Sequence, residues 1–426
     1  MIGVVCLLAL LVTAHRHPRP RTETAVALVV TGVVLATRYI GVHDAGDAVR
    51  PLAPVVGFLV AILIVAEVCA RAGLFEAAAD VVRHHSRRDP RRLFLGVFLL
   101  AAVVTTALSL DATVVLLTPV VIGAARTLLG PGGGASGRPG AYACLRLANS
   151  GSLLLPVSNL TNLLALPYLH LTFAGFALRM ALPLVVVLVV EYAGLRLLFR
   201  DELAPGVPDE TVADTPKKAT VSSGERACSS GERAWRFPAV VVVLMLIAFG
   251  VLSPFGVEPW VPAAVAAAAL LLWGVRRNVL TPTDAVHAAH PSFALWVLAL
   301  GIVVAGLSTD FLGDVVRHLL PSSTGFGALL LIAGIATLAS ALLANLSATL
   351  LIVPALTPLG DTAILAALLG LTIGAGLTWT GSLANLLWRR TLARDDIRPD
   401  SGRFHLVSLT LTPVALVAAV AALSVT

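Results

Sequence analysis

Long apolar segments alternate with short polar loops along most of this chain. A helix needs about 20 apolar residues to cross a bilayer, and many of these segments approach that length. The pattern predicts an all-α, polytopic membrane protein with about ten transmembrane helices. The expected single crossings are residues 1–14, 24–42, 54–73, 178–199, 238–253, 259–275, 291–308 and 405–425.

Two apolar segments are interrupted by polar residues near their middle. Residues 92–129 are too long for one crossing, and the break at Ser109 to Asp111 has basic residues beyond both ends. We expect a hairpin that enters the membrane and turns back at this break. Residues 326–358 predict a second hairpin with its tip near Asn345 to Thr349. Non-helical backbone at membrane depth is tolerated only beside protein or water, so both tips should face a cavity.

Two further segments read as broken helices. Residues 141–171 contain Pro156 and a polar run from Ser158 to Asn162. Proline removes a backbone donor and unwinds the helix, and Asn and Thr cap the ends that this frees. Residues 362–388 contain a matching break at Gly374, Gly376 and residues 378–382.

The two halves of the chain repeat the same plan. Residues 1–199 form the first predicted repeat, residues 200–236 a flexible cytoplasmic linker, and residues 237–426 the second repeat. Asp111-Ala112-Thr113 corresponds to Ser347-Ala348-Thr349, and residues 158–164 correspond to residues 381–387. One hairpin is expected to enter from each side, so the repeats are inverted. Inverted repeats with broken helices are typical of secondary transporters.

Composition and charge support a membrane location. The chain is 58% hydrophobic and 13% charged, far from the roughly 25% charge of a soluble domain. Most Lys and Arg residues fall in the loops predicted to be cytoplasmic, which predicts that both termini lie outside the plasma membrane. The net charge of +6 therefore indicates orientation and gives no reason to expect a nucleic-acid partner.

Asp111 is the one acid in the middle of a predicted hairpin, and a charge in hydrocarbon is costly. One interpretation is a proton-coupling group, because burial favours its neutral form. The other is an N-cap for the returning helix, with the carboxylate bound to backbone N–H groups. The sequence leaves both open.

Uncharged polar residues make up the rest of the predicted site. Their hydroxyls and amides suit a small hydroxylated solute or a dehydrated cation, although each could serve only to satisfy freed backbone groups. The candidate substrate-binding residues are Ser109, Thr113, Ser158, Asn159, Thr161, Asn162, Asn345, Ser347, Thr349, Thr378, Ser382 and Asn385.

The remaining polar residues do not suggest catalysis or metal binding. The cysteines are scattered and the histidines lie mostly in loops, so we expect no metal site and no cofactor. An intramembrane enzyme would need a second catalytic group beside Asp111, and a channel would be obstructed by two opposed hairpins. Glu67 and Arg71 should form an ion pair, and so should Glu191 and Arg196, whereas Arg146 is expected at the membrane interface.

The motifs together resemble the bacterial arsenical pump membrane proteins of the ion-transporter superfamily. The resemblance rests on residues 73–78, Asp111-Ala112 with Leu117-Thr118-Pro119, residues 158–162 and residues 381–388. It implies export of the neutral trihydroxide of As(III) or Sb(III) in exchange for protons. It also implies a transport domain that moves against a fixed scaffold, and it raises a cytoplasmic ATPase subunit and a homodimer as partners.

The chain departs from that family at several positions. Leu110 stands where the family has Asn, Leu346 replaces the second Asn of the second hairpin, and residues 374–379 lack charge. The alternative is a related carrier for Na⁺/H⁺ exchange or for small anions such as dicarboxylate or sulfate. A cation exchanger should have a second buried acid, and an anion carrier should have Ser-Asn-Thr at both tips. Neither feature is present, so a neutral solute fits best.

Overall fold

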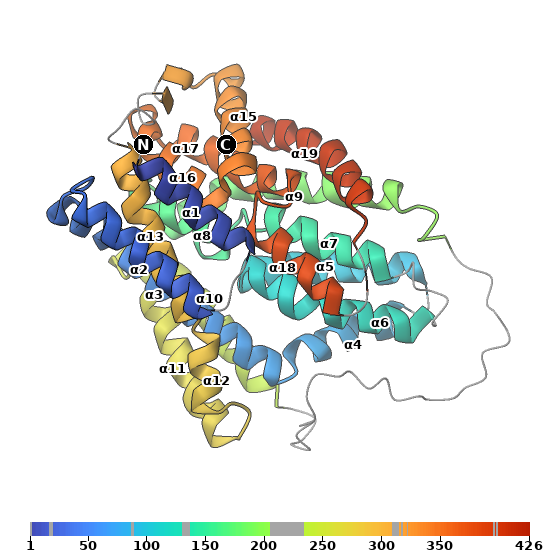
Figure 1. The fold of residues 1–426 in the computed structure, drawn as a ribbon. Coiled ribbons are helices and arrows are strands. Elements are labelled where there is room, and N and C mark those ends of the chain that lie inside the picture. Colours follow the sequence, from blue (N-terminus) through green and yellow to red (C-terminus); the bar gives the residue numbers. More distant parts are fainter. Residues whose placement is uncertain are drawn as a thin grey trace.

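The computed structural model describes most of the 426-residue chain. The described residues are 2–16, 20–86, 89–129, 137–204, 234–308, 315–316, 318–321, 323–394, 397 and 399–426. Most of the predicted linker 200–236, and residues 309–314 of the segment after the seventh predicted crossing, lie outside them. All regular elements in the described residues are helices, which confirms the all-α class (Figure 1).

The first half contains both parts of the first hairpin and of the first broken helix. Its helices are α1 (Ile2–Arg16), α2 (Pro20–Ala36), α3 (Val42–Arg71), α4 (Leu74–Ser86), α5 (Pro90–Ala107), the π-helix η1 (Ala112–Leu117), α6 (Thr118–Leu129), α7 (Gly137–Ser150), η3 (Pro156–Ser158), α8 (Leu160–Ala165), η4 (Leu166–Tyr168) and α9 (Phe173–Leu198).

The second half repeats this order. Its helices are α10 (Arg236–Leu252), η5 (Ser253–Phe255), α11 (Trp260–Arg276), α12 (Pro282–Ala288), α13 (Pro291–Ser308), α15 (Phe326–Leu343), α16 (Asn345–Leu356), η6 (Thr357–Leu359), α17 (Asp361–Gly374), η7 (Ala375–Leu377), α18 (Leu383–Arg394) and α19 (Ser401–Leu423).

Seven helical segments in the described residues are long and apolar enough to cross a membrane. They are Val42–Arg71, Pro90–Ala107, Phe173–Leu198, Arg236–Phe255, Thr283–Ser308, Phe326–Leu343 and Ser401–Leu423, and shorter apolar helices accompany them. This confirms a polytopic helical membrane protein. α3 corrects one predicted boundary, because it begins at Val42 and continues through Pro51 and Pro54. A proline removes only its own donor, and the flanking turns keep the helix continuous.

The helices pack into two units. α1, α2, α3, α10, α11 and α13 contact one another, and we call them the wall unit. Both hairpins (α5–η1–α6 and α15–α16), both broken helices (α7–α8 and α17–α18), α9 and α19 form the hairpin unit. The packing of α17 on α15 is close enough that a methyl group on Gly374 would lie 2.7 Å from the Thr337 Cα atom. Small residues permit such approach between membrane helices.

Candidate functional site

A cavity of about 470 Å³ lies between the two units, where both hairpin tips meet both helix breaks. On the hairpin-unit side it is lined by residues from 109–111, 157–163, 342–346 and 380–386. The opposite side is formed by apolar residues of α1, α3 and α13. Figure 1 shows α8 and α18, which follow the two breaks, in the middle of the molecule. The structure therefore brings together the four polar segments that the sequence singled out.

Asp111 lines this cavity at the first hairpin tip. Its side chain makes no capping hydrogen bond to η1, and Ser109 Oγ instead accepts the Ala112 backbone N–H at 3.2 Å. The Asp111 Oδ1 atom is buried without a hydrogen-bond partner among the described residues. The N-cap interpretation of Asp111 is therefore wrong, because the Ser109 hydroxyl caps this helix instead. The carboxyl group therefore lines the cavity with one oxygen that no described protein group satisfies.

The helix that returns from this tip starts with a π-helix. The Thr118 backbone N–H donates to the Thr113 carbonyl, five residues earlier, and Thr118 Oγ1 donates to the same carbonyl at 3.1 Å. Thr105 and Thr113 share a further hydrogen bond of 2.7 Å between their hydroxyls. π-Turns are rare and concentrate at functional sites. Here the wider turn follows directly after the one acid of the cavity.

The second hairpin turns differently. Its turn residue, Ala344, has φ 63° and ψ 152°, a conformation that is strained for a residue with a side chain. The Asn345 backbone N–H donates to the Gly381 carbonyl at 2.9 Å, so the tip is attached directly to the second break. The helix that follows is a regular α-helix.

Each break is held open by an asparagine. Asn162 Nδ2 donates to the carbonyls of Ser152 and Leu155, at 2.9 and 3.2 Å. Asn385 Nδ2 donates to the carbonyls of Ala375 and Thr378, both at 2.8 Å. In both breaks the acceptors lie ten and seven residues before the asparagine. The amide groups therefore satisfy the backbone that unwinding has freed, as buried carbonyls require.

The caps also lie at corresponding positions, and each break makes a hydrogen bond to a hairpin, although from residues that do not correspond. Asn159 Oδ1 and Ser382 Oγ each accept the backbone N–H two residues later, at 3.0 and 3.1 Å. Ser158 Oγ donates to the carbonyl of Thr106, and Thr378 Oγ1 donates to that of Ala341. Each break is thus hydrogen-bonded to the hairpin of its own half.

The predicted site residues form two layers. Asp111, Ser109, Ser158, Asn159, Thr161, Asn345 and Ser382 line the cavity. Thr113, Asn162, Ser347, Thr349, Thr378 and Asn385 do not line it and lie behind them, where all but Thr378 are buried. The sequence analysis missed Thr380 and the apolar wall. The wall residues gave no signal, because an apolar residue facing a cavity looks like one facing lipid.

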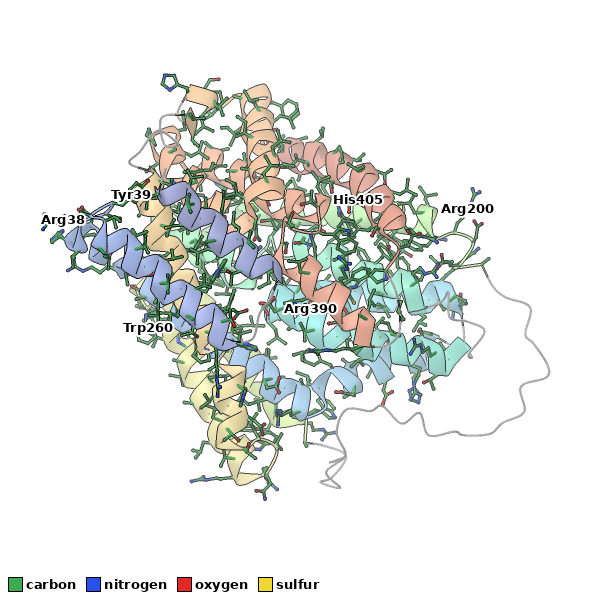
Figure 2. All side chains as sticks on the ribbon, viewed as in Figure 1. Arg38, Tyr39, Arg200, Trp260, Arg390 and His405 are labelled. Atoms are coloured by element: carbon green, nitrogen blue, oxygen red, sulfur yellow. The ribbon has the colours of Figure 1, made fainter. Side chains whose placement is uncertain are left out.

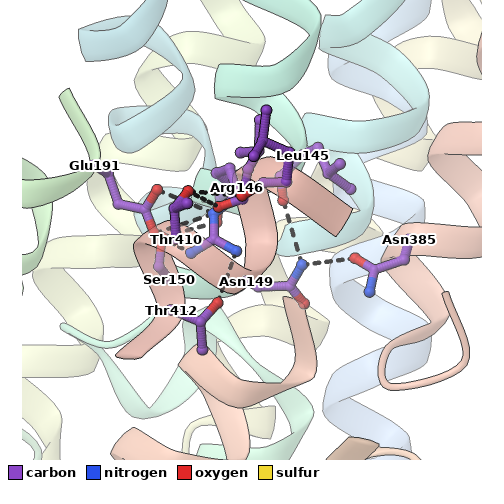
Figure 3. Close-up of polar contacts among 10 residues, drawn as sticks. Leu145, Arg146, Asn149, Ser150, Glu191, Asn385, Thr410 and Thr412 are labelled. Atoms are coloured by element: carbon purple, nitrogen blue, oxygen red, sulfur yellow. Dashed lines mark hydrogen bonds and ion pairs between the residues drawn. The ribbon is translucent and has the colours of Figure 1, made fainter. Parts of the chain in front are cut away.

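A buried ion pair lies behind the breaks (Figure 3). Arg146 Nε and Nη2 donate to the Glu191 carboxylate, and Nη1 donates to Thr412 Oγ1 at 3.1 Å. The two charged side chains are 2% and 0% exposed. The expected interfacial position of Arg146 is therefore wrong, since its partner comes from α9, far away in sequence. The expected pairing of Glu191 with Arg196 is wrong for the same reason, because the Glu191 carboxylate binds Arg146. By contrast, the predicted pair of Glu67 and Arg71 is confirmed at 2.7 Å.

Arg146 also bridges the two halves. Its Nη1 atom would lie 2.7 Å from a methyl group placed on Gly376, so the glycine of the second break makes room for this guanidinium. Asn149, one turn further along α7, donates through Nδ2 to Asn385 Oδ1 at 2.8 Å (Figure 3). Through these two side chains the first broken helix contacts the break of the second.

The cavity itself has little charge. Among the described residues that line it, Asp111 is the one acid, and there is no Lys, Arg or His. Arg146 does not line the cavity, and its guanidinium binds Glu191 and Thr412. Figure 2 shows Arg38 and Arg200 at the edges of the molecule. A neutral solute would therefore meet hydroxyls, amides and one carboxyl group among apolar side chains.

Comparison with known proteins places the chain in a family of membrane transporters. The family model described as citrate transporter (CitMHS) matches residues 8–374. An arsenical pump membrane protein of Escherichia coli is 27% identical over 380 residues, which cover 86% of this chain and 84% of the relative. Those of Escherichia coli strain K12 and Yersinia enterocolitica are both 28% identical, with the same coverage of both chains.

The fold is shared with a solved transporter. The crystal structure of the YdaH transporter of Alcanivorax borkumensis, described as having an unusual topology, matches with a TM-score of 0.58 at 15% identity. The match covers 96% of this chain and 98% of that one. Because the model of the family spans most of the sequence, the chain belongs to the citrate transporter (CitMHS) family, and it is a membrane transporter of the ion-transporter superfamily that resembles the arsenical pump membrane proteins.

Proposed function

We propose that this transporter exports arsenite and antimonite, as their neutral trihydroxides, in exchange for protons across a bacterial plasma membrane. The observation that carries the proposal is a cavity whose polar side chains are hydroxyls, amides and one carboxyl group, Asp111, whose Oδ1 atom has no partner among the described residues. The names of the three relatives support the choice of metalloid. In this proposal both termini lie outside and residues 200–236 are cytoplasmic.

Asp111 would couple the solute to the proton. Arsenous acid has three hydroxyl groups, and an ionised carboxylate can accept a hydrogen bond from one of them. Protonation converts one carboxylate oxygen into an O–H donor and weakens the other as an acceptor, so a protonated Asp111 would hold the solute less tightly. The neutral group could return through the membrane without the cost of carrying a charge through hydrocarbon, and binding of solute and of proton would oppose each other, as exchange requires.

Citrate is the substrate that the family's name suggests, and the site favours it less. A multiply charged carboxylate would need cationic or abundant N–H donors once it leaves water. The described lining provides no cation, and the nearby guanidinium of Arg146 is already neutralised by Glu191. A Na⁺/H⁺ exchanger is likewise disfavoured, because the lining has no second acid.

The test uses everted membrane vesicles that contain the protein or its variants. With an imposed pH gradient we expect arsenite accumulation by the native protein and a loss of at least tenfold in Asp111→Asn. The matched control is Asp361→Asn, the same substitution in a carboxylate that bonds to His170 and does not line the cavity. Undiminished transport by Asp111→Asn would overturn the coupling, and gradient-driven citrate or Na⁺ movement without arsenite movement would overturn the substrate.

A further inference from the structure

The cavity is much larger than the solute that the proposed function assigns to it. Its volume of about 470 Å³ corresponds to roughly fifteen water molecules at about 30 Å³ each. The trihydroxide of As(III) has four heavy atoms and would occupy a small part of this space. Pockets of this volume are typical of organic ligands.

The lining is also divided by chemistry. The hydroxyls, amides and the carboxyl group of the lining all come from the hairpin unit, which also contributes apolar side chains such as Leu110, Leu343 and Leu386. The wall unit provides apolar side chains from three helices, among them Leu8, Val12, Phe58, Ile62, Phe293 and Trp296. A solute of hydroxyl groups alone would leave this wall without any group that matches it.

The wall has an aromatic surface that offers no hydrogen bond. The rings of Phe293 and Trp296 stack with their centroids 5.8 Å apart and an interplanar angle of 10°. The one polar atom of this pair, Trp296 Nε1, donates to the Leu10 carbonyl at 3.3 Å. Flat apolar groups pack well on aromatic rings, and water gains little there.

Resting on the proposed function, we propose that the cavity takes organic trivalent arsenicals, R–As(OH)₂, whose R group is aryl or branched alkyl. The two hydroxyl groups would bond to the hairpin tips, as those of arsenous acid would. The organic group would occupy the space against α1, α3 and α13 that arsenous acid leaves empty. The molecule is neutral, so it meets the same charge requirement at Asp111.

The probes are phenylarsonous acid and arsenite, in everted vesicles with an imposed pH gradient. Uptake into vesicles from a host without the protein is subtracted, because the phenyl compound crosses lipid by itself. We expect the phenyl compound to be transported with a KM at least tenfold lower than that of arsenite. It should also compete with arsenite.

A narrowed wall should change the preference between the two solutes. In Val12→Trp, an indole at the α1 part of the wall should lower the ratio of phenylarsonous acid to arsenite transport at least tenfold. Leu8 also lines the cavity from α1, so Leu8→Trp gives a second measurement of this transport ratio if Val12→Trp folds poorly. Val5→Trp is the matched control, because Val5 is 62% exposed on the same helix and does not line the cavity. Its ratio should equal that of the native protein.

The outcomes separate the two proposals. Transport of arsenite without phenylarsonous acid would overturn this inference and leave the proposed function standing. Transport of neither would overturn the proposed function itself. Transport of both with an unchanged ratio in Val12→Trp and Leu8→Trp would show that the organic group does not lie against this wall, and it too would overturn the inference.

Discussion

The two halves of the chain hold their helix breaks in the same way but differ in charge. Asn162 and Asn385 make equivalent hydrogen bonds, ten and seven residues back, and Asn159 and Ser382 make equivalent caps. At the hairpin tips, by contrast, Asp111 in the first half corresponds to Ser347 in the second. The geometry is thus common to both halves, whereas the ionisable group belongs to one.

The difference separates two requirements. Every break at membrane depth must satisfy its freed backbone groups, whatever the solute, so both halves keep the amide. Charge is expensive at the same depth, and a carrier gains from a second buried acid only if it moves a second charge. The first half therefore carries Asp111 and the Arg146–Glu191 pair, and the second half makes room for Arg146 at Gly376.

The largest effect is expected from splitting the buried ion pair. Arg146→Leu or Glu191→Leu leaves one charge without its partner in a site that is at most 2% exposed, which costs about 3–5 kcal/mol. Thermal unfolding of the purified protein in detergent should show a large drop in Tm for each single variant. The double variant should recover much of the loss, because it removes both charges. Single variants as stable as the native protein would refute a structural function for the pair.

Asn162 and Asn385, whose amides satisfy the carbonyls of the two breaks, allow the stability of the breaks to be compared between the halves. Asn162→Leu leaves two carbonyls without donors, one buried and one partly buried, and a buried unsatisfied group costs about 1–3 kcal/mol. Asn385→Leu does the same and also removes the acceptor of Asn149 Nδ2, so its loss of unfolding free energy should be larger. Asn149→Ala should lower the stability of the native protein and have less effect when Asn385 is already Leu. Equal losses of unfolding free energy in Asn162→Leu and Asn385→Leu would mean that the hydrogen bond between Asn149 and Asn385 contributes nothing to stability.

The sequence was informative where a residue type has one structural use. Pro156, the glycines near 374 and the clustered Asn, Ser and Thr residues marked both breaks and both tips, because few other roles suit them inside apolar segments. The sequence could not pair Arg146 with Glu191, which lie 45 residues apart and come together only when α7 packs on α9. Nor could it assign the cap at the first tip, where Ser109 and Asp111 were both within reach of the same backbone and only geometry chose between them.

The smallest effect should come from the turn residues of the two hairpins, which differ in backbone strain. At the first tip, Leu108 has φ −114° and ψ −69°, which any residue adopts, whereas Ala344 at the second tip has φ 63°. Glycine has no Cβ atom to clash there, so Ala344→Gly should raise the free energy of unfolding by about 1 kcal/mol. Ala341→Gly, within α15, should lower it by about the same amount, since glycine is a poor helix residue. Opposite shifts in Tm for these two substitutions, three residues apart, would locate the backbone strain at the tip of the second hairpin. Destabilisation by both would mean that Ala344 is relaxed, and the contrast between the two tips would then lie in their charge alone.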